Sequence, residues 1–157
     1  MSDHNKVLHI IAHAPSPNTR RLRDALLSGA RHEDISGVTV RAIPPLEATP
    51  ETVLEADALI LFTTENLAYM SGAMKDFFDR CYYPCLEKAQ GLPYALVVRA
   101  GQDGTGTLRA MDSIITGLRW KAVQEPLLCR GTFNEAFVEQ CEELGMYMAA
   151  GLEAGIL

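Results

Sequence analysis

The sequence predicts an α/β fold in which a five-stranded parallel sheet lies between two layers of helices. Three observations predict it. Short apolar runs rich in Val, Ile and Leu alternate along the chain with segments whose apolar residues recur at helical spacing. Several of these runs are almost uninterrupted, which is typical of parallel strands covered on both faces. The length of 157 residues suits a single domain, residues 1–157, of this kind.

Five runs are predicted as strands, and their continuity indicates their place in the sheet. The first, third and fourth are nearly continuous in apolar residues and fit the middle. The second alternates and carries Arg41, which fits an edge, and the fifth is the weakest. Right-handed crossovers then favour a doubly wound three-layer α/β/α sandwich with the strand order 2-1-3-4-5. In chain order the runs are 7–12, 38–43, 58–62, 94–98 and 120–129.

A helix is predicted after each strand. Thr49 before Pro50 is a cap followed by a first-turn proline, and it begins a short second helix. Ser71 caps the third helix, which Pro84 is expected to end or bend. Apolar stripes at helical spacing mark the first, fourth and fifth helices. Their members are Leu22, Ala25, Leu26 and Gly29, then Leu108, Met111, Ile115 and Leu118, then Phe137, Cys141, Leu144 and Met148.

The composition excludes several classes of partner. With 20 acidic and 14 basic residues the net charge is −6, so the chain lacks the basic surface that nucleic acid or an anionic membrane requires. No apolar run approaches the roughly 20 residues of a membrane span. Residues 133–157 contain five glutamates and no Lys or Arg, and these carboxylates are expected mostly on the solvated face of the last helix.

The start of the chain and its cysteines indicate a cytoplasmic protein. Residues 1–6 are polar, and the apolar stretch after them is too short for the core of a signal peptide. The cysteines have no zinc or CxxC spacing, so we expect buried, reduced thiols and no metal site. The four are Cys81, Cys85, Cys129 and Cys141.

Ligands of doubly wound sheets bind at the carboxyl ends of the strands, so function is expected in loops 12–19, 63–71 and 100–107. In the first loop Ser16, Asn18 and Thr19 stand where a helix begins, and free backbone N–H groups there form an anion site. The same residues would also serve plain helix capping, and both interpretations stay open. Without glycine or a Gly-Lys-Ser/Thr sequence, the loop is neither a Walker loop nor a dinucleotide fingerprint.

A second motif surrounds the third predicted strand, in residues 55–80. It has an Ala-Asp-Ala entry, an apolar strand ending in Thr63, and a helix start with fixed spacing. The residues of that helix start are Met70, Ser71, Met74, Lys75, Phe77, Asp79 and Arg80. This run resembles the flavodoxin-like family, which includes the flavodoxins and the NAD(P)H-dependent FMN reductases. The first loop is similar to the phosphate loop of that family, and the resemblance covers essentially the whole chain.

The resemblance implies FMN at the strand ends, with its phosphate on Ser16, Asn18 and Thr19. The second loop would flank the isoalloxazine ring, where Tyr69 either stacks or seals the helix entry. Glu65 would contact ring or substrate, or else be a solvated side chain. Glycines of the third loop would allow close approach to the ring. The implied residues of these two loops are Thr63, Thr64, Glu65, Asn66, Leu67, Ala68 and Tyr69, then Gly101, Gln102, Asp103 and Gly104.

The chain departs from the family pattern at several loop positions. Pro17 stands where the family has Gly and offers no N–H, and Ala14 replaces a hydroxyl residue. Thr64 and Asn66 replace a usual Pro and Tyr, and Ala68 replaces a usual Gly. Each lost donor weakens binding by roughly 1 kcal/mol. The sequence is therefore consistent with weak, exchangeable FMN binding and also with its loss.

The function implied by the resemblance is that of an oxidoreductase. FMN would take a hydride from NAD(P)H and reduce a small acceptor such as a quinone or a second flavin, so no catalytic acid or base is predicted. One alternative is a flavodoxin-type electron carrier, whose acidic surface would steer it toward basic redox partners. Another is a cofactor-free relative that acts through protein contacts. Assembly as a homodimer or homotetramer is expected from the resemblance only.

Overall fold

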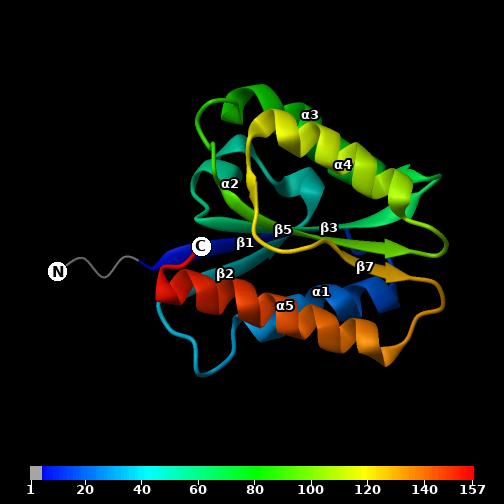
Figure 1. The fold of residues 1–157 in the computed structure, drawn as a ribbon, viewed down its shortest axis with the longest axis horizontal. Helices are drawn as coiled ribbons and strands as arrows, with labels where there is room; N and C mark the ends of the chain where they lie inside the picture. Colours follow the sequence, from blue (N-terminus) through cyan, green and yellow to red (C-terminus); the bar gives the residue numbers. More distant parts are fainter. Residues whose placement is uncertain (1–4) are drawn as a thin grey trace.

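A computed structural model describes residues 5–157 and shows a parallel sheet with helices on both faces (Figure 1). Residues 1–4, part of the polar start discussed above, lie outside the described residues. The parallel strands are β1 Lys6–Ala12, β2 Val38–Ile43, β3 Ala58–Asn66, β5 Pro93–Ala100, β6 Lys121–Ala122 and β7 Leu127–Arg130. Their spatial order is β2-β1-β3-β5, and β5 then pairs with both β6 and β7. The predicted order 2-1-3-4-5 is confirmed.

The helices form the two outer layers. They are α1 Pro17–Ala30, α2 Pro50–Leu54, α3 Gly72–Cys85, α4 Thr105–Leu118 and α5 Glu135–Ala154, with a short 3-10 turn η1 at Pro45–Glu47. Figure 1 shows α1 and α5 together on one face of the sheet, and α3 and α4 on the other. The predicted caps Thr49 and Ser71 are confirmed, because each accepts a backbone N–H from the first turn of α2 and α3, and Ser16 caps α1 in the same way.

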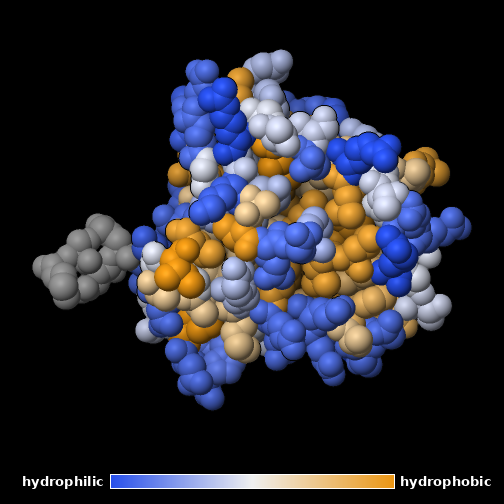
Figure 2. All heavy atoms as spheres, viewed as in Figure 1, coloured by the Kyte–Doolittle hydropathy of each residue, from blue (hydrophilic) through white to orange (hydrophobic). Residues whose placement is uncertain are grey.

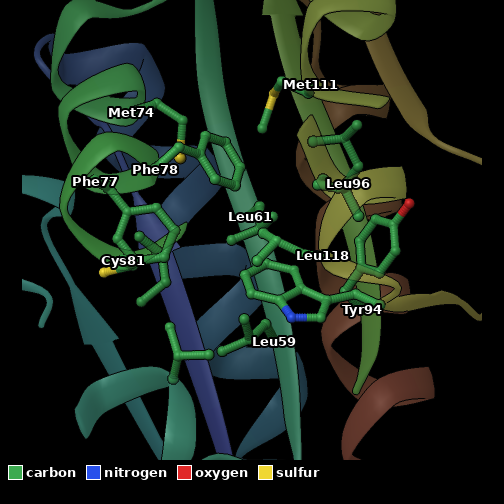
Figure 3. Packing of buried hydrophobic residues seen from close by; sticks show 14 of the residues in the cluster. Leu59, Leu61, Met74, Phe77, Phe78, Cys81, Tyr94, Leu96, Met111 and Leu118 are labelled. Carbon is green, nitrogen blue, oxygen red and sulfur yellow. The ribbon is translucent and has the colours of Figure 1, made fainter. Parts of the chain in front are cut away.

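The central strand β3 contributes to the core on both of its faces. Leu59 and Leu61 lie in the layer of α3 and α4, where Phe77 packs close to them (Figure 3). Ile60 and Phe62 alternate to the opposite face and pack in the layer of α1 and α5. All four β3 side chains are fully buried. The uninterrupted apolar run therefore predicted a doubly covered strand correctly, and it gives the loops at its carboxyl end a rigid support.

The same strand is longer than predicted. It continues past Phe62 to Asn66 and turns back as β4, Tyr69–Met70, in an antiparallel hairpin. Glu65 is paired with Met70, and Asn66 with Tyr69. The predicted loop 63–71 is thus mostly a hairpin, and its backbone is held by strand pairing.

The fifth predicted strand is two short strands, so the prediction of one strand over 120–129 is corrected. β6 pairs with the start of β5 and β7 with its end, while residues 123–126 leave the sheet. Pro126 has no N–H to donate to a ladder. The interruption leaves a cavity of about 280 Å³, and Figure 2 shows the face of the molecule hollowed and apolar there, near α4. Its lining residues are Tyr94, Leu96, Leu108, Arg109, Asp112 and Pro126.

Pro84 was predicted to end or bend α3, and the helix ends one residue beyond it. The helix includes Pro84 in its last turn and ends at Cys85. Cys81 and Cys85 therefore share the buried face of α3, and all four cysteines are buried and free, as predicted. Burial raises the pKa of the Cys81 thiol to about 12, so this group stays protonated at neutral pH.

The glutamates of the last helix are exposed, which confirms the prediction of a solvated acidic face. Glu135 forms a salt bridge of 2.5 Å with Arg21 of α1, and this guanidinium lowers the pKa of the Glu135 carboxyl. Glu153 accepts the Ser36 N–H at 2.7 Å. Among residues 5–157, no helix has the length and hydropathy needed to cross a membrane.

Candidate functional site

The three loops predicted to carry function meet at the carboxyl ends of β1, β3 and β5. Parallel pairing places Ala12 beside Phe62, and Thr64 beside Arg99. The helix after β1 packs on one face of the sheet, whereas the helix after β3 packs on the opposite face. Such a reversal opens a crevice between neighbouring strand ends, where doubly wound sheets bind their ligands.

The first loop closes on itself in a reciprocal capping box at the start of α1. The Thr19 N–H donates to Ser16 Oγ at 3.2 Å, and the Ser16 N–H donates to Thr19 Oγ1 at 2.9 Å. The two hydroxyl oxygens lie 2.8 Å apart, and Thr19 Oγ1 also donates to the Ser16 carbonyl. Thr19 is only 5% exposed. The capping interpretation is therefore realised in the structure, and the Thr19 hydroxyl is used within the capping box, while the phosphate contact stays a prediction.

A phosphate group still fits this helix start, on a reduced set of donors. Asn18 is exposed at the second position of α1, so its backbone N–H and side-chain amide are available. The Ser16 hydroxyl can turn from Thr19 toward an anion, because charge-assisted hydrogen bonds are the stronger ones. The positive end of the α1 dipole points at the same place. Pro15 and Pro17 offer no N–H, so this cradle is weaker than one lined by glycine.

The Thr63 side chain serves the fold, so the predicted contact of this residue with a cofactor is left to its backbone. The residue is fully buried, and its hydroxyl accepts the Ser71 N–H at 3.1 Å. The Ser71 hydroxyl in turn caps α3 by accepting the Met74 N–H. Thr63 therefore fixes the end of β3 to the start of α3.

The tip of the hairpin has an uncommon backbone. Leu67 and Ala68 form the two-residue turn, with φ angles of +53° and +64°. This left-handed region suits Asn-Gly turns and disfavours residues that carry a Cβ. Thr64 donates its hydroxyl proton to the Asn66 side-chain oxygen at 2.8 Å. The Leu67 side chain is fully exposed and Tyr69 is 40% exposed, so both are accessible beside the crevice.

Replacing Ala68 with glycine is expected to raise the free energy of unfolding by about 0.5 kcal/mol, because glycine adopts a positive φ without strain. The matched control is Ala110→Gly in the middle of α4. There the helical φ suits alanine, and glycine should lower the free energy of unfolding by about 1 kcal/mol. Urea denaturation of both variants measures the two values. A loss of similar size at both positions would contradict strain at the hairpin tip.

Two hydrogen bonds tie this hairpin to the third loop. Glu65 is half-buried, and its Oε2 accepts the Gly104 N–H at 2.6 Å. Thr107, in the first turn of α4, donates its hydroxyl proton to the Tyr69 carbonyl at 2.9 Å. The interpretation of Glu65 as a solvated loop side chain is therefore wrong. No local pattern indicated Thr107, because its partner lies 38 positions away.

The remaining predicted residues of the third loop divide into two groups. Asp103 is held in place, since its carbonyl accepts from Arg130 Nε at 2.9 Å and its carboxylate accepts the Thr105 hydroxyl proton. Gly101 and Gln102 are exposed where β5 ends. Gly101 and Gln102 are thus solvent-accessible, while the Gly104 N–H already has Glu65 as its partner.

One further group near this edge was not indicated by the sequence. Arg99, near the end of β5, lies with its guanidinium carbon 5.8 and 5.3 Å from the ring centroids of Phe133 and Phe137. It also donates to the carbonyls of Ala100 and Cys129 at 2.6 and 3.0 Å. These contacts hold a positive charge near the end of β5. They join segments about 30 residues apart, which no local pattern can show.

A cavity of about 270 Å³ opens beside the first loop. Its polar side chains come from His13, Arg23 and Glu47, and small or apolar residues form the rest of its wall. Burial lowers the pKa of His13, so the imidazole is neutral at pH 7. No cluster of three or more metal-ligating side chains occurs in the part of the chain that the structure describes. The carboxyl edge therefore has a second recess next to the candidate phosphate site.

Comparison with known proteins identifies sequence relatives. A family model described as "NADPH-dependent FMN reductase" matches residues 7–134, a range that contains all three loops. A curated protein named flavodoxin, from Aquifex aeolicus (strain VF5), is 33% identical over 113 residues. That alignment covers 72% of this chain and 60% of the relative, so the chain matches less than two thirds of that protein's length.

Solved structures share the fold. A flavodoxin from the domain Archaea superposes with a TM-score of 0.78 at 17% identity, covering 93% of this chain and 98% of that one. A flavodoxin, WrbA-like protein from Agrobacterium tumefaciens gives a TM-score of 0.72 at 15% identity, covering 98% and 99%. At these identities the similarity shows the fold alone, and it confirms the predicted flavodoxin-like sandwich.

Proposed function

The chain belongs to the NADPH-dependent FMN reductase family, and we propose that it binds FMN at the carboxyl edge of its sheet and passes electrons from NAD(P)H to a small acceptor such as a quinone or a flavin. The observation that carries this proposal is the family match over all three loops of the crevice. When bound, FMN supplies the hydride and electron chemistry. The residues of the protein are then needed to bind and orient the flavin and to exclude water from it.

Each loop has a separate role in this proposal. Asn18 and Ser16 would hold the phosphate at the start of α1, and the buried Thr19 would support them. The hairpin residues 64–69 would flank the ring, with the half-exposed Tyr69 side chain next to it. Gly101 and Gln102, beside the fixed Asp103, would cover the pyrimidine edge. No side chain is required as a general acid or base, since the flavin carries the chemistry.

We expect the purified protein to take up added FMN reversibly, because two prolines reduce the donors in the phosphate cradle. A titration should perturb the visible flavin spectrum and saturate at about one FMN per chain, with the flavin lost again on gel filtration. The FMN-loaded protein should then oxidise NADPH when a flavin or quinone acceptor is present. An FMN spectrum that stays unchanged at every protein concentration would contradict the proposal.

The second candidate is a flavodoxin-type electron carrier. The 33% identical relative bears the name flavodoxin, and the net charge of −6 suits attraction to basic redox proteins. The two candidates differ in turnover without a partner protein. A carrier loaded with FMN would show almost no direct NADPH oxidation, whereas the proposed reductase needs no second protein.

A further inference from the structure

Glu65 joins the hairpin that would flank the flavin ring to the loop that would cover its pyrimidine edge. We propose that Glu65 is a positioning residue of the flavin site, whose carboxylate fixes the β3–β4 hairpin against the start of α4 and so sets the separation of the two loops. This inference rests on the proposed function, because it concerns how the same crevice is shaped for a flat ring.

The first argument is the hydrogen bonding at the start of α4. Gly104 is the N-cap of this helix and has no side chain to cap it. In a capping box, the residue at the third helical position returns a side-chain acceptor to the N-cap N–H. In α4 that third position is Thr107, and it donates to the Tyr69 carbonyl instead. Glu65 therefore supplies, from another element, the acceptor that the helix itself lacks.

The second argument is the direct backbone contact between the two elements. A Cβ added to Gly106 would overlap the Ala68 carbonyl oxygen, so the hairpin tip rests on the first turn of α4. Gly104 has a φ of +77°, and a Cβ there would lie 2.6 Å from Leu128 Cδ1. The start of α4 is therefore in close contact with the hairpin at Gly106 and with β7 at Gly104, and it cannot shift toward either.

These contacts make the hairpin and the third loop one unit. Glu65 approaches from the end of β3, Thr107 reaches back to β4, and Gly106 sets the closest approach. The carboxylate also lies near the positive end of the α4 dipole, and this attraction strengthens its hydrogen bond to the Gly104 N–H. If Glu65 loses its acceptor oxygens, the Gly104 N–H loses its partner and the third loop is free to move away from the hairpin.

The test compares Glu65→Ala with Glu65→Gln in the full chain, and measures FMN and riboflavin affinity by fluorescence titration. Glu65→Ala is expected to weaken both ligands about tenfold, the effect of losing one hydrogen bond to a charged group. Glu65→Gln keeps a side-chain oxygen of the same reach, so its affinities should stay within about threefold of the original. Equal loss for both ligands is expected because riboflavin lacks only the phosphate, which lies at the other loop.

The control is Glu139→Ala, which removes an exposed carboxylate from α5 and should change neither affinity. Affinities of Glu65→Ala that equal those of the original protein would overturn the inference while leaving FMN binding intact. Failure of the original protein to bind either flavin would instead overturn the proposed function, and this inference with it.

If Glu65→Ala does not fold, Thr107→Val provides a second test. It removes the hydrogen bond from Thr107 to the Tyr69 carbonyl and should weaken the binding of both flavins severalfold. Unchanged affinity in this variant would also overturn the inference.

Discussion

Replacing Gly145 with alanine is expected to lower the free energy of unfolding by about 3 kcal/mol. Gly145 lies in α5 where this helix crosses α1, and a Cβ there would overlap the Leu26 carbonyl oxygen. Gly29 makes the reciprocal contact, since its Cβ would overlap the Glu142 carbonyl oxygen. Both obstructing groups are backbone atoms within helices, so neither can turn aside as a flexible side chain does. The two helices must separate, and the buried layer between them loses close packing.

Urea denaturation measures this loss, and Gly72→Ala is its matched control. Gly72 begins α3 and has no atom within 4 Å of an added Cβ, so alanine there should be neutral or slightly stabilising. A Gly145→Ala variant as stable as Gly72→Ala would contradict the close crossing. Because α1 begins at the proposed phosphate site, we expect Gly145→Ala also to weaken FMN binding, although residue 145 is remote from that loop in sequence.

The fold was predictable because its signals are local. Continuous apolar runs identified β1, β3 and β5 as covered strands, and Arg41 marked β2 as an edge strand, which the pairing confirms. Ser16, Thr49 and Ser71 were identifiable as caps from their neighbours alone. Strand order then followed from the handedness of crossovers, a rule that holds for nearly all parallel sheets.

The hairpin was missed because its turn has no local signal. Two-residue hairpin turns are read from Asn-Gly or Asp-Gly, and this chain has Leu67 and Ala68 in positive-φ positions. Tertiary contacts hold that turn, above all the backbone of Ala68 on Gly106. The sequence therefore indicated where the second loop lies and which residues it contains, but not its shape.

The location of the candidate site could be predicted from the sequence, but the role of each residue in it could not. Ser16, Asn18 and Thr19 lie at the start of α1 as expected, yet which hydroxyls are used by the capping box depends on their geometry. The same limit applies to Thr63, whose hydroxyl is used by Ser71. A polar residue in a loop motif can serve the fold or a ligand, and only its partners show which.

Replacing Pro17 with glycine is expected to tighten FMN binding about tenfold, because it restores a backbone N–H at the start of α1. Pro17 is the first residue of the helix, a position whose N–H has no partner inside the helix and points toward an anion at the N terminus. Hydrogen bonds to charged groups contribute roughly 1.5–3 kcal/mol, whereas the greater freedom of glycine in the unfolded chain lowers the stability of the fold and not the affinity of the folded protein. Fluorescence titration with FMN measures the gain.

Two comparisons separate this gain from a general change in the loop. Riboflavin lacks the phosphate, so its affinity should be the same for Pro17→Gly and the original protein. Pro50→Gly is the matched variant, since Pro50 also begins a helix behind a Thr49–Thr52 capping box of the same form, and it lies outside the three loops of the crevice. Both substitutions should lower the free energy of unfolding by about 1 kcal/mol, and only Pro17→Gly should tighten FMN. If riboflavin gains as much as FMN, the added N–H does not act on the phosphate, and the start of α1 is not the phosphate site.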